Sequence, residues 1–87
     1  MNEGVERRVV SAIVVGTFGH EGFRTLWDLL RERCDVRPTH FTGSNKTMPN
    51  DLAMFEVRTD LNNVGLRRLL TQVSGVKQIR FKEEHHA

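Results

Sequence analysis

The chain has a single cysteine, two prolines and no tyrosine among its 87 residues. One cysteine can form neither an internal disulfide nor a cysteine-based zinc site. No apolar run reaches the ~18 residues that a membrane span requires, and the N-terminus lacks the apolar segment of a signal peptide. We therefore expect a cytoplasmic protein with no membrane contact.

An excess of charge is also missing, because 13 Lys and Arg are balanced against 11 Asp and Glu, a net charge of +2. The two signs are interspersed, which is typical of a solvated surface. Single-stranded nucleic acid favours aromatic rings beside the cations, but the chain has no tyrosine, and Phe81, within the loose basic set, is expected in the core. That set is Arg67, Arg68, Lys77, Arg80 and Lys82. We expect no nucleic-acid partner.

What the chain does have is clear apolar periodicity, which predicts alternating strands and helices. Residues 8–15 are apolar on both faces, as in a central strand covered on both sides. Residues 21–34 carry one continuous apolar stripe at helical spacing. The expected elements are strand 8–15, helix 21–34, strand 36–42, strand 52–59, a helix between Asp60 and Gly75, and strand 76–82.

This order predicts a ferredoxin-like βαββαβ sandwich of the α+β class, with a four-stranded antiparallel sheet and both helices on one face. Pro38 cannot donate to a strand ladder, so its strand is expected at one edge and the charged last strand at the other. The length fits one domain, 1–87, whose ends 1–6 and 83–87 look frayed.

Helices on one face leave the other face of the sheet open to solvent. An apolar patch there favours a partner, so we expect a homodimer, or a different protein docked on the open face. The alternative is that these residues serve strand propensity alone. The residues predicted for this interface are Val10, Ala12, Val14, Leu52 and Met54.

The most informative segment is the turn that connects the first strand to the first helix. Its glycines allow backbone N–H groups to converge beside the positive end of a helix dipole, which favours a small anionic ligand. The alternative is a tight connection without a ligand, in which Arg24 pairs with Asp28 in solvent. The candidate ligand-binding residues are Gly16, Thr17, Phe18, Gly19, His20, Gly22 and Arg24.

The sequence contains few arrangements of residues typical of a catalytic site. It has no His-x-x-x-His on a helix, no paired carboxylates, and no Ser or Cys beside a base. His20 and Glu21 could form an acid–base pair, although Glu21 is more typical of a first-turn acid that the helix dipole favours. The glycine spacing matches neither a P-loop nor a dinucleotide fingerprint. We expect no metal and no cofactor.

An apolar strand ends in Gly16, and a short loop, Gly22 and an apolar helix follow it. Further along come Ala53-Met54-Phe55-Glu56-Val57 and the ending Ser74-Gly75-Val76-Lys77-Gln78-Ile79. In these features nearly the whole chain resembles ACT domains, the small regulatory modules of amino-acid metabolism and stress signalling. The resemblance implies a dimer that binds a small effector, often an amino acid, near the first turn.

A second, shorter likeness lies in Gly16-Thr17-Phe18-Gly19-His20-Glu21-Gly22-Phe23-Arg24. It resembles the phosphate loop of acylphosphatases, which share the βαββαβ order. That resemblance implies that Arg24 cradles a phosphate and that Asn45 is the nearest candidate to orient the attacking water.

Three functions follow from these observations. The preferred function is a regulatory domain that senses a small carboxylate effector at the glycine turn and acts through dimerisation. The alternatives are a hydrolase of acyl phosphates and a protein–protein interaction module without a small ligand.

Overall fold

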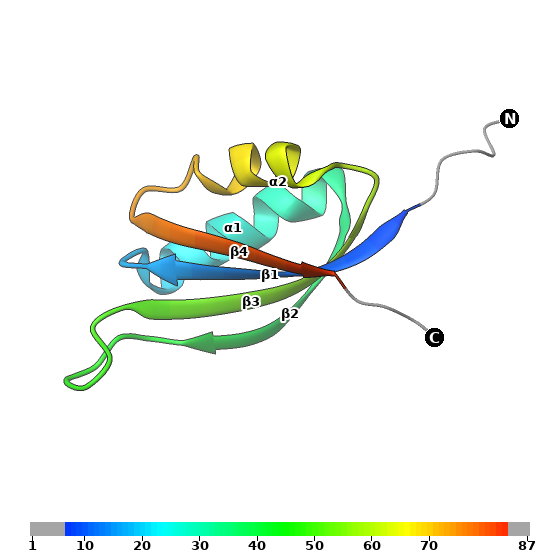
Figure 1. Ribbon diagram of the computed structural model, residues 1–87. Helices are drawn as coiled ribbons and strands as arrows, with labels where there is room; N and C mark the ends of the chain where they lie inside the picture. Colours follow the sequence, from blue (N-terminus) through cyan, green and yellow to red (C-terminus); the bar gives the residue numbers. More distant parts are fainter. Residues whose placement is uncertain (1–6, 84–87) are drawn as a thin grey trace, which may run out of the picture.

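The structure is a computed structural model, and it describes residues 7–83. All strands pair antiparallel in one sheet of order β2-β3-β1-β4, and both helices cover the same face (Figure 1). The predicted ferredoxin-like α+β fold is therefore confirmed. The elements are β1 (Arg8–Gly16), α1 (Gly19–Arg33), β2 (Asp35–Thr42), β3 (Asp51–Thr59), α2 (Asn63–Leu70) and β4 (Val76–Glu83).

The strand order confirms that β1 and β3 are central and that β2 and β4 form the edges. Pro38 lies opposite Phe55, and the register of β2 against β3 shifts between Pro38 and His40. A residue without an N–H is tolerated at such a place, on an edge strand beside a bulge. Of the ends expected to be frayed, Glu83 closes β4, while 1–6 and 84–87 lie outside the described residues.

The core lies between the sheet and the two helices. Strands contribute every second side chain to it, and the helices contribute residues spaced by four, as the two periodicities require. The central members are fully buried, and they are Val10, Ala12, Val14, Ala53, Phe55, Val57, Leu26, Leu30, Leu66 and Leu70.

One part of this arrangement corrects the prediction. We expected Val10, Ala12 and Val14 on the open face, but all three are 0% exposed and lie under the helices. The register gives the reason, because directly opposite residues of an antiparallel pair share a face. These three stand opposite the core residues Val57, Phe55 and Ala53 of β3.

The open face of β1 carries Val9, Ile13 and Val15 instead, all half-buried. Leu52 and Met54 of β3 do lie on that face, as predicted, opposite Val15 and Ile13. A strand with apolar residues on both faces does not reveal by alternation which face meets the helices.

The helix ends differ slightly from the predicted ones. α1 begins at Gly19 and ends at Arg33, so Cys34 follows the helix rather than belonging to it. The thiol of Cys34 is buried and donates to Oγ1 of Thr59 over 3.2 Å. Asn62 caps α2 by accepting the N–H of Gly65 at 2.9 Å.

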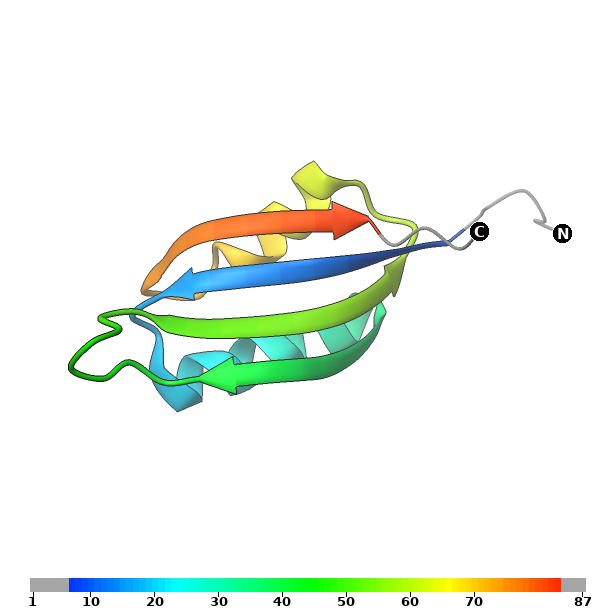
Figure 2. The same cartoon turned by 60° about the horizontal axis from the view of Figure 1, so that its bottom comes forward.

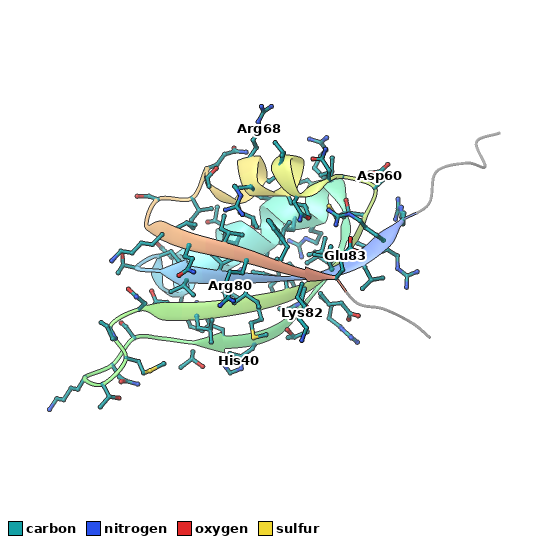
Figure 3. All side chains as sticks on the ribbon, in the orientation of Figure 1. His40, Asp60, Arg68, Arg80, Lys82 and Glu83 are labelled. Carbon is teal, nitrogen blue, oxygen red and sulfur yellow. The ribbon has the colours of Figure 1, made fainter. Side chains whose placement is uncertain are left out.

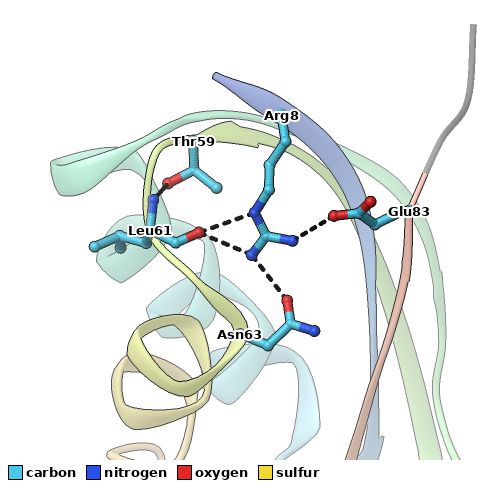
Figure 4. A network of polar contacts seen from close by, with 5 residues as sticks. All are labelled: Arg8, Thr59, Leu61, Asn63 and Glu83. Carbon is cyan, nitrogen blue, oxygen red and sulfur yellow. Dashed lines mark hydrogen bonds and ion pairs between the residues drawn. The ribbon is translucent and has the colours of Figure 1, made fainter. Parts of the chain in front are cut away.

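Arg8 joins three segments at one end of the sheet (Figure 4). Its Nε and Nη2 donate to the carbonyl oxygen of Leu61 over 3.0 and 2.8 Å. Nη2 also donates to Oδ1 of Asn63, and Nη1 pairs with Oε2 of Glu83, each over 2.8 Å. One planar guanidinium thus links β1 to β4 and to the connection between β3 and α2.

Candidate functional site

Gly16, the first glycine of the turn after β1, is required by the close approach of two backbones. A Cβ on Gly16 would lie 2.1 Å from the carbonyl oxygen of Gly75, and one on Gly75 would lie 2.6 Å from that of Thr17. The N–H of Thr17 donates to this Gly75 oxygen over 2.8 Å. Two glycines therefore allow the backbones at the end of β1 and the start of β4 to touch.

The other two glycines of the turn also serve the backbone. Gly19 has a φ of +72°, a conformation that L side chains rarely adopt. A Cβ on Gly22 would lie 2.5 Å from the Cβ of Phe18, a core side chain that is 8% exposed. Each of the three glycines of the turn therefore has a backbone or packing reason of its own.

The place of an anion at the start of α1 is taken by Asp51. This carboxylate is 5% exposed, and its Oδ2 accepts the N–H of Gly19 over 2.8 Å. Its Oδ1 accepts the N–H of Ser44, also over 2.8 Å. A negative group at a helix N-terminus is stabilised by the free N–H groups and the helix dipole. The chain therefore supplies its own carboxylate to the turn.

Sequence reasoning missed Asp51 because it began the third strand one residue later. The signal that could have found it is the pairing of the two central strands. Once their register is fixed, Gly16 stands opposite Asp51. An acidic residue at that position lies beside the turn.

The remaining predicted ligand residues do not converge on one point. Gly16, Phe18 and Gly22 are buried, and Thr17 is exposed at the bend. Only His20 and Arg24 share a hollow. It measures about 350 Å³, follows the outer side of α1, and is also lined by Phe23, Trp27, Asp28 and Arg31.

Helical spacing places Asp28 at pairing distance from both Arg24 and Arg31. In the structure it pairs with Arg31, and the pair with Arg24 is not formed. The guanidinium of Arg31 lies over the ring of Trp27, 5.5 Å from its centre. Within residues 7–83, Arg24 forms no ion pair.

Asn45, the candidate of the hydrolase alternative, is occupied by its own turn. Its Oδ1 accepts the N–H of Thr47, the hydroxyl of Thr47 and the N–H of Met48, each over 2.9 Å. The loop that holds it extends beyond the strands (Figure 2). Because that oxygen is already used three times, the geometry gives no support to a water oriented by Asn45.

The open face of the sheet is the second candidate site. Its centre holds half-buried apolar side chains from β1 and β3, and no described element covers them (Figure 2). At one end Met48, which is 50% exposed, and Pro49 join Val15 and Leu52 around a hollow of about 180 Å³. The central residues are Val9, Ile13, Val15, Leu52 and Met54.

Charged side chains flank this apolar centre. On the β2 side Arg37 pairs with Glu56, and Arg7 pairs with Asp35 over 2.8 Å. On the β4 side, Arg80 and Lys82 form no ion pair with any described residue. Figure 3 shows Arg80 and Lys82 on the sheet side and Arg68 and Asp60 on the helix side.

Comparison with models of known protein families finds no match, and comparison with curated proteins finds no related sequence. The two family resemblances therefore stay predictions. Within residues 7–83, no helix is long and apolar enough to cross a membrane. The same residues contain no cluster of three or more His, Cys, Asp or Glu side chains placed to hold a metal.

Proposed function

We propose that this domain is a homodimerisation module whose open sheet face packs against the same face of a second copy. The observation that carries the proposal is the uncovered apolar centre of β1 and β3. Burying apolar surface is favourable by about 25 cal/mol per Å². The helices already cover the opposite face, so among the described elements nothing is left to cover this one.

Strand propensity is the competing explanation for these residues, and it accounts for only part of them. Val9, Ile13 and Val15 are β-branched and favoured in any strand. Leu52 and Met54 are not among the residues enriched in strands, yet they stand directly opposite Val15 and Ile13. Burial against a partner explains all of these residues.

The size and charge of the chain favour a second copy as the partner. A domain of 87 residues has a small core, and association adds to its stability. The net charge of +2 produces little repulsion between two copies.

The test is the association state of two matched variants. Ile13→Asp places a charge in the apolar centre, while Val64→Asp places one on α2, where Val64 is 61% exposed. In sedimentation over a concentration series, we expect a dimer for the wild type and for Val64→Asp, and a folded monomer for Ile13→Asp. A wild type that stays monomeric up to millimolar concentration contradicts the proposal.

A second candidate function is the sensing of a small carboxylate effector, which the hollow on α1 favours. Arg24 is free to bind a carboxylate there, beside His20 and the half-buried Trp27. In this reading the effector binds along α1 rather than at the glycine turn, where Asp51 already takes the anion position.

The single tryptophan of the chain makes this candidate easy to test. We expect an amino acid that binds the hollow to change the fluorescence of Trp27 and to raise the melting temperature. Arg24→Ala is expected to abolish both responses, while Arg33→Ala, on the same helix but outside the hollow, leaves them unchanged. No response to a full amino-acid panel, in protein shown to be dimeric, counts against effector binding.

A further inference from the structure

The open face is ordered into rows across the sheet by the strand register. In one row Ser11 of β1 stands between Lys82 of β4 and Glu56 of β3. Both strands neighbour β1, so the two opposite charges lie at the same height, each about 4.8 Å to one side of it. β1 therefore separates the cation Lys82 from the anion Glu56 in this row, and Arg37 of β2 follows Glu56.

The next row again has a cation on β4, but its central residue on β1 is apolar. Ile13 stands between Arg80 of β4 and Met54 of β3, and Met54 is followed by His40 of β2. The Ser11 and Ile13 rows lie on either side of Ala12, the middle residue of β1. In these two rows the β4 side carries the cations Lys82 and Arg80, while the β3 side carries Glu56 and the apolar Met54.

We propose that the second copy packs face to face about a twofold axis parallel to β1, so that Lys82 of each copy meets Glu56 of the other. This inference rests on the proposed homodimer. Rotation by 180° about such an axis keeps every row at its height and exchanges its two flanks. Two equivalent Lys82–Glu56 contacts form, and the Ile13 side chains of the two copies meet near the axis.

The other twofold axis in the plane of the sheet, perpendicular to the strands, gives a worse match. It places β4 of one copy over β4 of the other. Arg80 and Lys82 of one copy then face Arg80 and Lys82 of the second copy. Neither side chain has a partner among the described residues that would neutralise it. Like charges facing one another across an interface oppose association.

The twist of the two sheets leaves the Lys82–Glu56 contacts in place. Aligned sheets pack with their strands about 30° apart, which displaces peripheral rows more than central ones. The Ser11 row is next to the centre of β1. Glu56 already holds Arg37 of its own chain, and its side chain is still 38% exposed, so it can accept a second cation.

Charge reversal tests the arrangement directly. We expect Lys82→Glu and Glu56→Lys each to weaken its homodimer by about tenfold, because each creates two like-charged contacts in place of two salt bridges. Mixing the two variants restores both contacts: one pairs the two unchanged residues, Lys82 and Glu56, and the other pairs the two substituted ones with their signs exchanged. The mixed dimer is then expected to form about as tightly as the wild type.

Matched controls come from the helix side of the molecule. Arg68→Glu and Asp60→Lys change the charge by the same amounts, and both residues are exposed there (Figure 3). Their homodimers should keep wild-type affinity, and their mixture should show no preference for the mixed dimer. Thermal unfolding of Glu56→Lys at fixed concentration checks that the loss of its contact with Arg37 leaves the chain folded.

The outcomes separate this inference from the proposed function. If Lys82→Glu tightens the homodimer, the axis runs across the strands and the inference is wrong. A dimer that Ile13→Asp dissociates, but whose charge variants show no preference for mixing, also overturns the inference and leaves the homodimer standing. A wild type that is monomeric at every concentration removes both.

Discussion

Replacing Asp51 by alanine removes the carboxylate that ties the start of α1 to the loop after β2. Two N–H groups, of Gly19 and Ser44, then lose their acceptor. Hydrogen bonds to a charged group contribute about 1.5–3 kcal/mol each. After subtraction of the cost of burying the charge, we expect unfolding to become easier by about 2–4 kcal/mol.

For a domain of this size that loss lowers the melting temperature by about 10–30 °C. Asp51→Asn is expected to lose about half as much, because its amide oxygen still accepts one of the two N–H groups while the charge is gone. The assay is urea unfolding at one fixed chain concentration, which keeps any contribution of association constant.

Asp35→Ala is the matched control, since its carboxylate also pairs with a cation but is 73% exposed. Exposed ion pairs contribute about 0–1 kcal/mol, so its loss should be small. If Asp51→Ala also costs less than about 0.5 kcal/mol, the carboxylate does not hold the turn.

Formate gives this reasoning a second readout, because it has the shape of the group that alanine lacks. We expect formate to raise the melting temperature of Asp51→Ala but not that of the wild type, in which Asp51 occupies the site. Chloride at equal ionic strength controls for a general salt effect. Equal responses of the two proteins to formate would mean that the N–H groups at the turn do not select a carboxylate.

The other predictions concern the backbone and the Arg8 contacts, and urea unfolding checks each of them. Arg8→Ala should cost about 1–3 kcal/mol, and Arg8→Lys should recover little of it, because one ammonium cannot reproduce the planar set of contacts in Figure 4. Equal stability of Arg8→Lys and the wild type would contradict this. Gly19→Ala should cost about 1–2 kcal/mol for its positive φ alone, since its Cβ meets nothing within 4 Å. Gly75→Ala should cost clearly more, because its Cβ would also clash with the carbonyl of Thr17; the reverse order would refute the argument.

The fold could be predicted because local signals agreed with one another. Alternation and helical spacing gave the element order, and Pro38 marked an edge strand. The helix predicted between Asp60 and Gly75 is present as α2.

Two features depend on contacts that alternation does not contain. β1 is apolar on both faces, so only its register against β3 shows that Ala12 and not Ile13 faces the helices. Asp51 is distant in sequence from Gly19, and its role follows from a hydrogen bond between the first residue of β3 and the first residue of α1. Spacing along the chain could therefore suggest an anion at the turn but not that the chain supplies it.

The residues that β1 places on the open face favour a partner there. The face of β1 toward the helices holds Val10, Ala12 and Val14, and all three are fully buried. The larger Ile13 lies on the other face, where it meets Met54. A face evolved only for contact with water would have no reason to place the bulkier apolar pair there. If Ile13→Thr, which keeps β-branching and removes apolar volume, leaves association unchanged, strand propensity is the better explanation of this face.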